Sequence, residues 1–326
     1  MTDRVSPRVA LLAAIAVLVA AALVPAEIGG RRGYGLGTTA VILVILALGY
    51  QVTYGFSGQL SVAVAPLQGV GAFTAARLMA DHGWSFWAAL PLAILAAAAV
   101  GALVGLPGLR VRGDVLALAT LGAGEILQQL YANTEWFSGG YQGIVGIPHV
   151  SIFGTALDDR GLYVVALAIG AVVLAAVLAL RRSPIGRAWL ALRDDDVAAK
   201  AFGIRTSRVR LLAFAVGAGM AGAAGALYAV QTGFVSSVSF GLRETVTVIL
   251  VVLVAGEARI GRTVVAAVVA TAIIDRLSGY GDVSEAVTGA VILAVVFTRT
   301  GLAGAAWTRL RARARLGPPA RLEGAP

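Results

Sequence analysis

The chain has 326 residues, of which 59% are hydrophobic and 13% are charged, and its mean hydropathy is +0.86. A soluble domain needs about 25% charged residues to cover its surface, so this composition excludes a water-soluble globular protein. In a membrane protein, the question that a net charge of +9 raises is on which side of the membrane the basic residues lie, so the charge gives no reason to expect nucleic acid as a partner. Cysteine is absent, and the two histidines, His82 and His149, fall in different predicted loops, so neither a disulfide nor a metal site is expected.

Apolar stretches near membrane-spanning length recur along nearly the whole chain. They predict an all-α polytopic membrane protein of about ten transmembrane helices, each crossing a hydrocarbon core of about 30 Å. One transmembrane domain is expected over 1–298, followed by a basic tail over 299–326. The predicted spans are 9–26, 36–50, 57–80, 86–105, 114–131, 161–180, 209–230, 241–256, 262–278 and 284–298. Glycines and polar residues interrupt the stretch from 36 to 79, which indicates broken or closely packed helices in the N-terminal half.

Two groups of polar residues at membrane depth are candidates for a translocation path. Glu125 is the only carboxylate well inside a predicted span, and Gln128 and Gln129 follow it on the same helix face. A charge at that depth is costly and indicates function, although a hydrogen-bond network between helices would also explain it. The second group lies in the interrupted stretch and consists of Gln59, Ser61 and Gln68.

The basic residues predict how the chain is oriented. With the N-terminus in the cytoplasm, 20 of the 26 basic residues fall on the cytoplasmic side of ten spans. The six on the other side are Arg31, Arg32, Arg77, Arg160, Arg243 and Arg276. This asymmetry follows the positive-inside rule, so both termini are expected in the cytoplasm. A cleaved signal peptide at the first span is an alternative, but the apolar stretch there is long for that role.

Two segments outside the membrane have simple interpretations. The outer loop 132–160 contains a glycine-rich turn, SGGYQG at 138–143, without the strand and helix that a phosphate-binding loop needs. The segment RLRARAR at 309–315 is expected to contact anionic lipid headgroups, and a specific partner site is the alternative.

The cytoplasmic loop 181–208 contains the sharpest local signal. Three aspartates at 194–196 precede VAAKAF at 197–202, and Gly203 follows. Acidic residues cap the start of a helix and glycine permits a left-handed residue after its end, so a short helix bounded at both ends is predicted. Its small alanines favour close docking against a protein. A helix lying on lipid is the alternative, but anionic lipid would repel the three carboxylates.

Several motifs in this loop and before it match a known family. The pattern Ala198-Ala199-x-x-x-Gly203 resembles the EAA loop of ABC importer permeases, with Val197 in place of that loop's usual glutamate. The stretch 186–231 is similar to the M-type membrane subunit of the branched-chain amino acid permease family. Further matches follow in the family's order at GQLS (58–61), GVGAFTA (69–75), LRVRGDVLAL (109–118) and GEI (124–126). The chain departs from the family after Ser61, at Gln142 and over 256–262, which leaves the substrate open.

The resemblance implies one membrane half of an ABC importer in a bacterial plasma membrane, which carries branched-chain or related small amino acids or amides. It implies a second homologous permease subunit, two cytoplasmic ATP-binding subunits and an extracytoplasmic substrate-binding protein as partners. The helix of the cytoplasmic loop would then dock an ATPase through Asp194, Asp195, Asp196, Ala198, Ala199, Lys200 and Gly203. Lys200 is the only lysine and follows an alanine, so the chain has no Gly-Lys-Ser/Thr phosphate loop. No cofactor is expected here, because ATP would be hydrolysed on the partner subunits.

An ion-coupled secondary transporter of small polar solutes is the alternative, because such proteins also contain broken helices and polar residues at membrane depth. They seldom carry a capped helix in a cytoplasmic loop and usually have more than one carboxylate inside the membrane. A membrane-embedded enzyme fits less well, because the sequence contains no histidine cluster, paired carboxylates or nucleophile motif.

Overall fold

The computed structural model describes residues 30–111, 113–152 and 155–278, and the residues up to Asp275 form one compact unit. The predicted spans 9–26 and 284–298, the end of the predicted transmembrane domain at 298 and the tail 299–326 lie outside the described residues.

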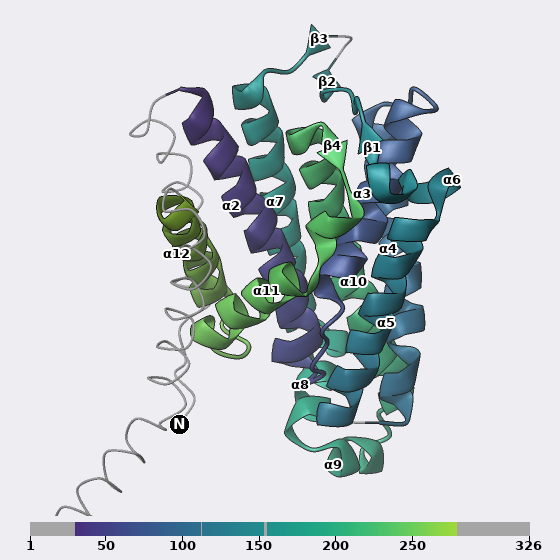
Figure 1. The fold of residues 1–326 in the computed structure, drawn as a ribbon. Coiled ribbons are helices and arrows are strands. Elements are labelled where there is room, and N and C mark those ends of the chain that lie inside the picture. Colours follow the sequence, from purple (N-terminus) through teal and green to yellow (C-terminus); the bar gives the residue numbers. More distant parts are fainter. Residues whose placement is uncertain (1–29, 112, 153–154, 279–326) are drawn as a thin grey trace, which may run out of the picture. The chain divides into compact units, whose positions relative to one another are not determined.

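Six helical segments within the described residues are long and apolar enough to cross a membrane (Figure 1). They are α2 (Arg31–Tyr50) with its extension η1 (Gln51–Phe56), α4 (Phe86–Val104), α5 (Asp114–Asn133), α7 (Asp159–Arg182), α10 (Thr206–Thr232), and α11 (Leu242–Ala255) with the 3-10 turn η4 (Ser237–Phe240) before it. Two more helices are α3 (Val64–Ala80), with 17 residues, and α12 (Ile260–Ser278), which contains three charged residues. An all-α multi-pass fold is confirmed, whereas the number of ten spans stays a prediction.

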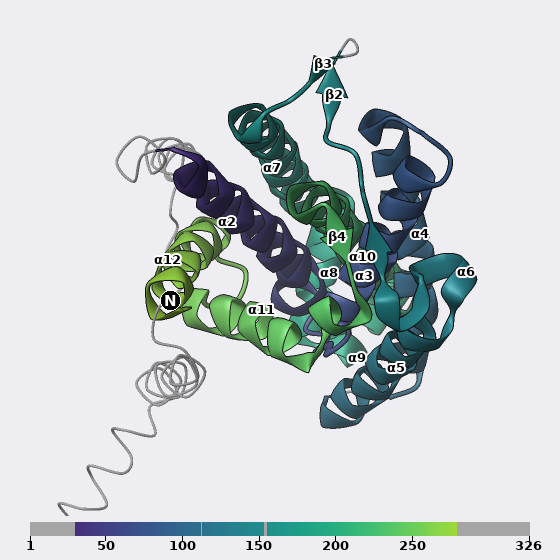
Figure 2. The same ribbon diagram turned by 45° about the horizontal axis from the view of Figure 1, so that its top comes forward.

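Helix α10 forms the centre of the bundle and packs against α2, α3 and α4. Its buried face consists almost entirely of glycine and alanine from Gly217 to Ala229. A Cβ atom at Gly71 of α3 would lie only 2.3 Å from the carbonyl oxygen of Gly222, so the two backbones are in direct contact. Lipid tails are as apolar as leucine, so such helices are held together by close packing of small residues and by hydrogen bonds between helices. The two views in Figures 1 and 2 place α5 at the edge of the bundle, away from α2 and α7.

The interrupted stretch differs from the prediction of one span over 57–80. Helix α2 continues as the π-helical segment η1, residues 57–63 are irregular, and α3 begins only at Val64. We attribute the change of helix type to Gln51. Its side chain occupies the space beside Gly55, where its Oε1 lies 1.7 Å from the position that a Cβ atom at residue 55 would take. Gln51 thereby reaches the connection between α11 and α12: its Nε2 donates to Gly256 O (2.9 Å), and its Oε1 accepts from Ala258 N (3.0 Å).

The irregular backbone at 57–63 is mostly buried in protein, and the exposed Gly58 lines a cavity, which are the two settings in which such backbone is tolerated at membrane depth. Val62 N donates to Thr120 Oγ1 of α5 at 2.9 Å, and Ala65 N, in the first turn of α3, donates to Thr245 Oγ1 of α11 at 3.1 Å. Side chains of two other membrane helices therefore satisfy the donors that the break and the start of α3 leave open.

Short elements close the two ends of the bundle. At one end, β1 (Ile144–Val145) pairs antiparallel with β4 (Phe234–Val235), and β2 (Ser151–Ile152) with β3 (Thr155–Ala156). The helix α6 (Glu135–Ser138) and the turn η3 (Gly140–Gln142) lie beside them. At the opposite end lie the turn η2 (Leu106–Leu109) and the helices α8 (Pro184–Asp194) and α9 (Asp196–Ala201) (Figure 1).

The glycine-rich turn of the loop 132–160 has a structural explanation. Gly143 has a φ of 71° and packs so closely on the β4 strand that a Cβ atom would lie 2.3 Å from Val235 O. Glycine at this position lets β1 pair with β4, which ties this end of α5 to the end of α10.

Candidate functional site

The loop 181–208 folds into two helices anchored on α10. Ser183 caps α8 by accepting a hydrogen bond from Gly186 N (3.1 Å), and Pro184 occupies the first helical position. Trp189 is fully buried, and its indole Nε1 donates to Val209 O at 2.8 Å. The large apolar side chain and its bond to the first turn of α10 hold α8 in a fixed place.

Helix α9 has the caps that the sequence predicts. The Oδ1 of Asp195 accepts hydrogen bonds from Val197 N (2.8 Å) and Ala198 N (3.1 Å). At the other end Gly203 has a φ of 78°, Gly203 N donates to Lys200 O (2.9 Å), and Ile204 N donates to Ala199 O (3.1 Å). This is a Schellman motif, so the predicted short helix with an acidic start and a glycine end is confirmed.

The side chains of α9 divide into an exposed and an inward-facing set. Val197 is 72% exposed and Phe202, just after the helix, is 87% exposed. Of the predicted docking residues, Asp194, Asp195, Ala198, Lys200 and Gly203 are exposed, whereas Ala199 and the side chain of Asp196 face the protein. Phe202 is not among the predicted docking residues, because nothing local in the sequence says whether an aromatic residue at a helix end is buried.

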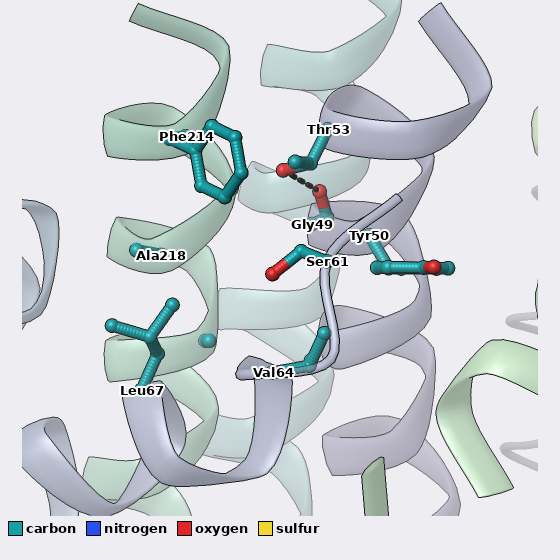
Figure 3. Close-up of a pocket in the computed structure, with 10 residues that line it drawn as sticks. Gly49, Tyr50, Thr53, Ser61, Val64, Leu67, Phe214 and Ala218 are labelled. Atoms are coloured by element: carbon teal, nitrogen blue, oxygen red, sulfur yellow. Dashed lines mark hydrogen bonds between the residues drawn. The ribbon is translucent and has the colours of Figure 1, made fainter. Parts of the chain in front are cut away.

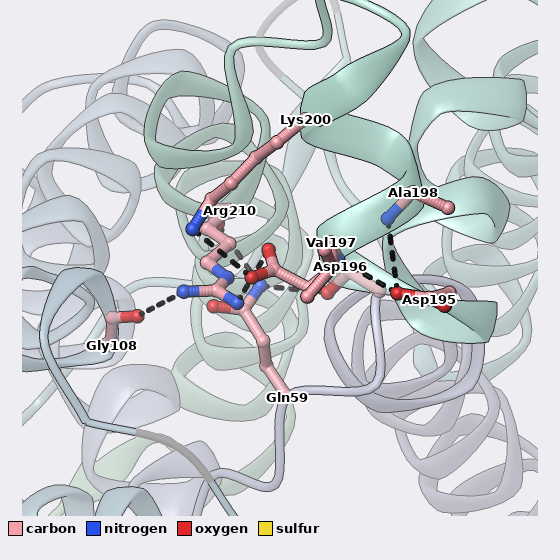
Figure 4. Close-up of polar contacts among 9 residues, drawn as sticks. Gln59, Gly108, Asp195, Asp196, Val197, Ala198, Lys200 and Arg210 are labelled. Carbon is pink, nitrogen blue, oxygen red and sulfur yellow. Dashed lines mark hydrogen bonds and ion pairs between the residues drawn. The ribbon is translucent and has the colours of Figure 1, made fainter.

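Inside the loop, Asp196 forms a buried ion pair with Arg210 of α10 (Figure 4). Arg210 Nη2 lies 3.0 Å from Asp196 Oδ1, and each side chain is only 9% exposed. Arg210 Nη1 also donates to Gly108 O of η2 at 3.2 Å. Lys200 adds a more exposed contact, with its Nζ 3.2 Å from Asp196 Oδ2. The pair therefore joins α9 to α10 and to the turn between α4 and α5.

The predicted path residue Gln59 belongs to this same cluster. Its Nε2 donates to Ser57 Oγ (2.7 Å) and to the backbone oxygen of Arg210 (3.2 Å). A cavity of ≈ 210 Å³ adjoins these groups and is lined by the irregular segment, η2 and the aspartates 194–196. The structure thus brings one candidate of the path to the base of the candidate docking helix.

A second arginine ties α8 to the interrupted segment. Arg193 Nη1 donates to Gly55 O at 2.7 Å, and its Nη2 forms an ion pair with Glu257. Tyr54 Oη donates to the same carboxylate at 2.9 Å. Glu257 lies in the stretch 256–262 that departs from the family pattern, and there it contacts Arg193 of α8 and Tyr54 of η1.

The other path candidates lie apart from this cluster. Glu125 is exposed on α5, Gln129 is exposed and Gln128 is half-buried, while the buried Thr120 and Gly124 belong to the face of the helix that packs on the bundle. Among the described residues, Glu125 has no hydrogen-bond or ion-pair partner.

Ser61 and Gln68 are buried, and Ser61 lines a cavity of ≈ 10 Å³ between η1, α3 and α10 (Figure 3). That volume holds about one water molecule, so it offers no passage for an amino acid. In the part of the chain that the structure describes, no three His, Cys, Asp or Glu side chains are grouped so that they could hold a metal.

Comparison with known proteins connects these features to a family. The profile described as branched-chain amino acid transport system / permease component matches residues 34–297. The chain is 35% identical over 309 residues to the high-affinity branched-chain amino acid transport system permease protein LivM of Salmonella typhimurium and to that of Escherichia coli, covering 87% of this chain and 72% of each relative.

The autoinducer 2 import system permease protein LsrC of an Enterobacter species is 31% identical over 232 residues, which cover 69% of this chain and 63% of the relative. No solved structure matches the chain significantly. The match of the family profile over most of the chain, together with the apolar helices, leads to one conclusion: this multi-pass membrane protein belongs to the family of branched-chain amino acid transport system permease components.

Proposed function

We propose that the chain is one membrane subunit of an ABC importer for branched-chain or related small amino acids or amides, driven by two separate cytoplasmic ATP-binding subunits. Family membership supports the permease role, and the names of the LivM relatives support the substrate class. The family argues against the ion-coupled secondary transporter. A second homologous permease subunit and an extracytoplasmic substrate-binding protein complete the proposed assembly.

The observation that carries this proposal is the exposed surface of α9, which we call the docking tip and define as Val197, Ala198, Phe202 and Gly203. It presents large apolar side chains at the end of a loop that Trp189 and Arg210 hold firmly. Exposed apolar groups framed by polar residues are typical of protein–protein contacts. The exposed carboxylates of the aspartates beside it disfavour anionic lipid as the contact.

The membrane topology of the proposal follows the distribution of basic residues. It has ten spans, one transmembrane domain over 1–298, both termini and the loop 181–208 in the cytoplasm of a bacterium, and the tail 299–326 against lipid headgroups. The eight basic residues of 181–210 support this orientation, because positive residues concentrate on the cytoplasmic side.

The translocation path in this proposal runs along the outer face of α5, between this subunit and the second permease. A carboxylate at mid-span that faced lipid would be costly, so the exposed Glu125 needs a protein or water-lined surface opposite it. The absence of a partner for Glu125 among the described residues favours this role over a hydrogen-bond network within the subunit. The small cavity at Ser61 supports a path outside the single subunit.

Co-purification tests the docking tip. The tagged chain is expressed with its genomic neighbours, solubilised in detergent and analysed for bound ATPase subunits. We expect wild type to retain them, Phe202→Asp to lose them, and the matched control Tyr141→Asp, which changes a 76% exposed aromatic side chain in the turn η3 at the other end of the bundle, to retain them. Gly203→Trp is expected to uncouple ATP hydrolysis from uptake. Normal transport by both docking-tip variants would show that the docking assignment is wrong.

A separate experiment tests Glu125. Glu125→Ala removes the carboxylate without adding bulk, so the assembled complex is expected to form while uptake falls. Uptake by proteoliposomes, compared at equal amounts of assembled complex, measures the effect. A Glu125→Ala complex that transports at the wild-type rate would remove this residue from the path.

A further inference from the structure

We propose that Arg210 is a positioning residue that transmits displacement of α9 to the irregular segment 57–63, with Gln59 as its alternative partner. The inference rests on the proposed docking of an ATPase at α9. A six-residue helix does not hold its own place, because isolated helices of that length are unstable. Its position must come from contacts to the rest of the chain, and the buried ion pair of Asp196 with Arg210 is the strongest charged contact it makes.

Arg210 joins three segments that are far apart in the sequence. Its guanidinium binds Asp196 Oδ1 of α9 (3.0 Å) and Gly108 O of η2 (3.2 Å), and its own backbone oxygen accepts from Gln59 Nε2 (3.2 Å) (Figure 4). Arg210 lies near the start of α10, the helix that packs against α2, α3 and α4. A force that moves Asp196 therefore acts on the central helix of the bundle and on the break in the N-terminal helices.

Gln59 offers the guanidinium a second acceptor. Its side chain is buried, and its Oε1 has no hydrogen-bond partner among the described residues. The amide cannot be turned round to satisfy this oxygen, because the other amide atom faces the backbone oxygen of Arg210, which only accepts. A Cβ atom at Gly108, whose oxygen binds Arg210, would lie 3.3 Å from Gln59 Oε1. A buried acceptor without a donor is unfavourable, and here Gln59 lines the same cavity as Arg210, whose guanidinium is engaged with Asp196 and Gly108.

The adjoining cavity gives this cluster room to rearrange. It is lined by Gln59, Gly108, Asp196 and Arg210 and has a volume of ≈ 210 Å³. When α9 moves away with a closing ATPase subunit, the guanidinium exchanges Asp196 for Gln59 Oε1. The cluster then has two discrete arrangements, which is what a packed interface needs to convert a small displacement into a change of state.

The experiment uses the complete importer, with ATPase subunits and binding protein, reconstituted in proteoliposomes. The readouts are substrate taken up per ATP hydrolysed and the amount of ATPase that co-purifies. For Arg210→Met we expect normal co-purification and about tenfold less uptake per ATP, since coupling between sites typically corresponds to 5- to 150-fold effects. Gln59→Leu keeps the ion pair but removes the alternative acceptor together with the amide donor to Arg210 O, and it is expected to lower the same ratio. The control Arg208→Met changes an exposed arginine of the same helix and is expected to match wild type.

A charge exchange separates transmission from folding. Asp196→Arg combined with Arg210→Asp restores a pair of opposite charges at the same place, and we expect it to recover most of the lost uptake per ATP. An unchanged ratio in Arg210→Met and Gln59→Leu would overturn the inference. Loss of co-purification in Arg210→Met would also overturn it, because the arginine would then only shape the docking surface. Failure of the proposed function is seen separately, as wild-type protein that binds no ATPase subunits.

Discussion

Replacing Gly225 of α10 by alanine tests whether backbone contact between helices holds the bundle together. A Cβ atom at this position would lie 2.1 Å from Gln68 O and 2.7 Å from Ala72 N of α3. Both atoms belong to the backbone, so no side-chain rotation relieves the overlap. Because a carbon and an oxygen atom pack at about 3.3 Å, helices α3 and α10 must separate by roughly 1 Å.

The expected loss of stability follows from that separation. A gap of about 1 Å removes roughly a quarter to a half of each van der Waals contact, and a contact contributes about 0.1–0.2 kcal/mol. For about forty atom pairs across the crossing, the loss is about 2 kcal/mol, in the range of other overpacked cores. This corresponds to a roughly 30-fold change in the unfolding equilibrium.

Gly219 of the same helix provides the matched control. A Cβ atom there would meet its nearest neighbour, Ile94 Cγ2, at an ordinary 3.4 Å. Gly219→Ala is therefore expected to leave stability unchanged or to raise it by up to about 1 kcal/mol through helix propensity. Unfolding of the solubilised protein in mixed micelles with increasing SDS, followed by circular dichroism, measures both variants. Equal stability of the two alanine variants would refute the reasoning.

Three further substitutions act on local features. Ala258 is the only non-glycine residue with positive φ among those described (57°). Ala258→Gly should relieve this backbone strain and raise the free energy of unfolding by about 1 kcal/mol, so a lower SDS midpoint would contradict the assigned strain. Gln51→Leu removes the acceptor of Ala258 N and should destabilise by about 1–3 kcal/mol in the same titration. Asp195→Ala removes the cap of α9 and should lower the local stability of this helix by about 1 kcal/mol. Amide hydrogen exchange should then become faster at Val197 and Ala198, while exchange in α10 stays unchanged.

Much of the fold was predictable because membrane helices are defined by length and hydropathy. The prediction of one span over 57–80 was wrong because a long-range contact decided it. Gln51 begins the π-helical segment η1, and its Nε2 donates to Thr263 Oγ1 (2.7 Å), 212 residues later in the chain. The same side chain also binds the backbone of Gly256 and Ala258. The sequence identified this region as interrupted, but it could not say where the helix changes its hydrogen bonding.

The candidate site shows the same division. The grouping of Glu125 with Gln128 and Gln129 on one helix was predictable from spacing, whereas the exposure of Glu125 on this subunit was not. Gln59 and Glu125 were both candidates for one path, yet the structure places Gln59 beside Arg210 in the cluster at α9 and Glu125 on an exposed face of α5. The spacing of residues along a helix predicts which of them share a face. Whether that face is buried or exposed depends on the helices that pack around it, which the spacing does not specify.

By itself, the sequence determined that the protein lies in a membrane, that a capped helix lies in the loop 181–208, and that no phosphate loop is present. Each of these depends on a few consecutive residues or on the composition of one segment. The tertiary structure decided that Phe202 is exposed, and that Asp196 reaches Arg210 and through it Gly108, 102 residues earlier in the chain. Such contacts form only when separate helices pack, because residues far apart in the sequence come together only in the assembled bundle.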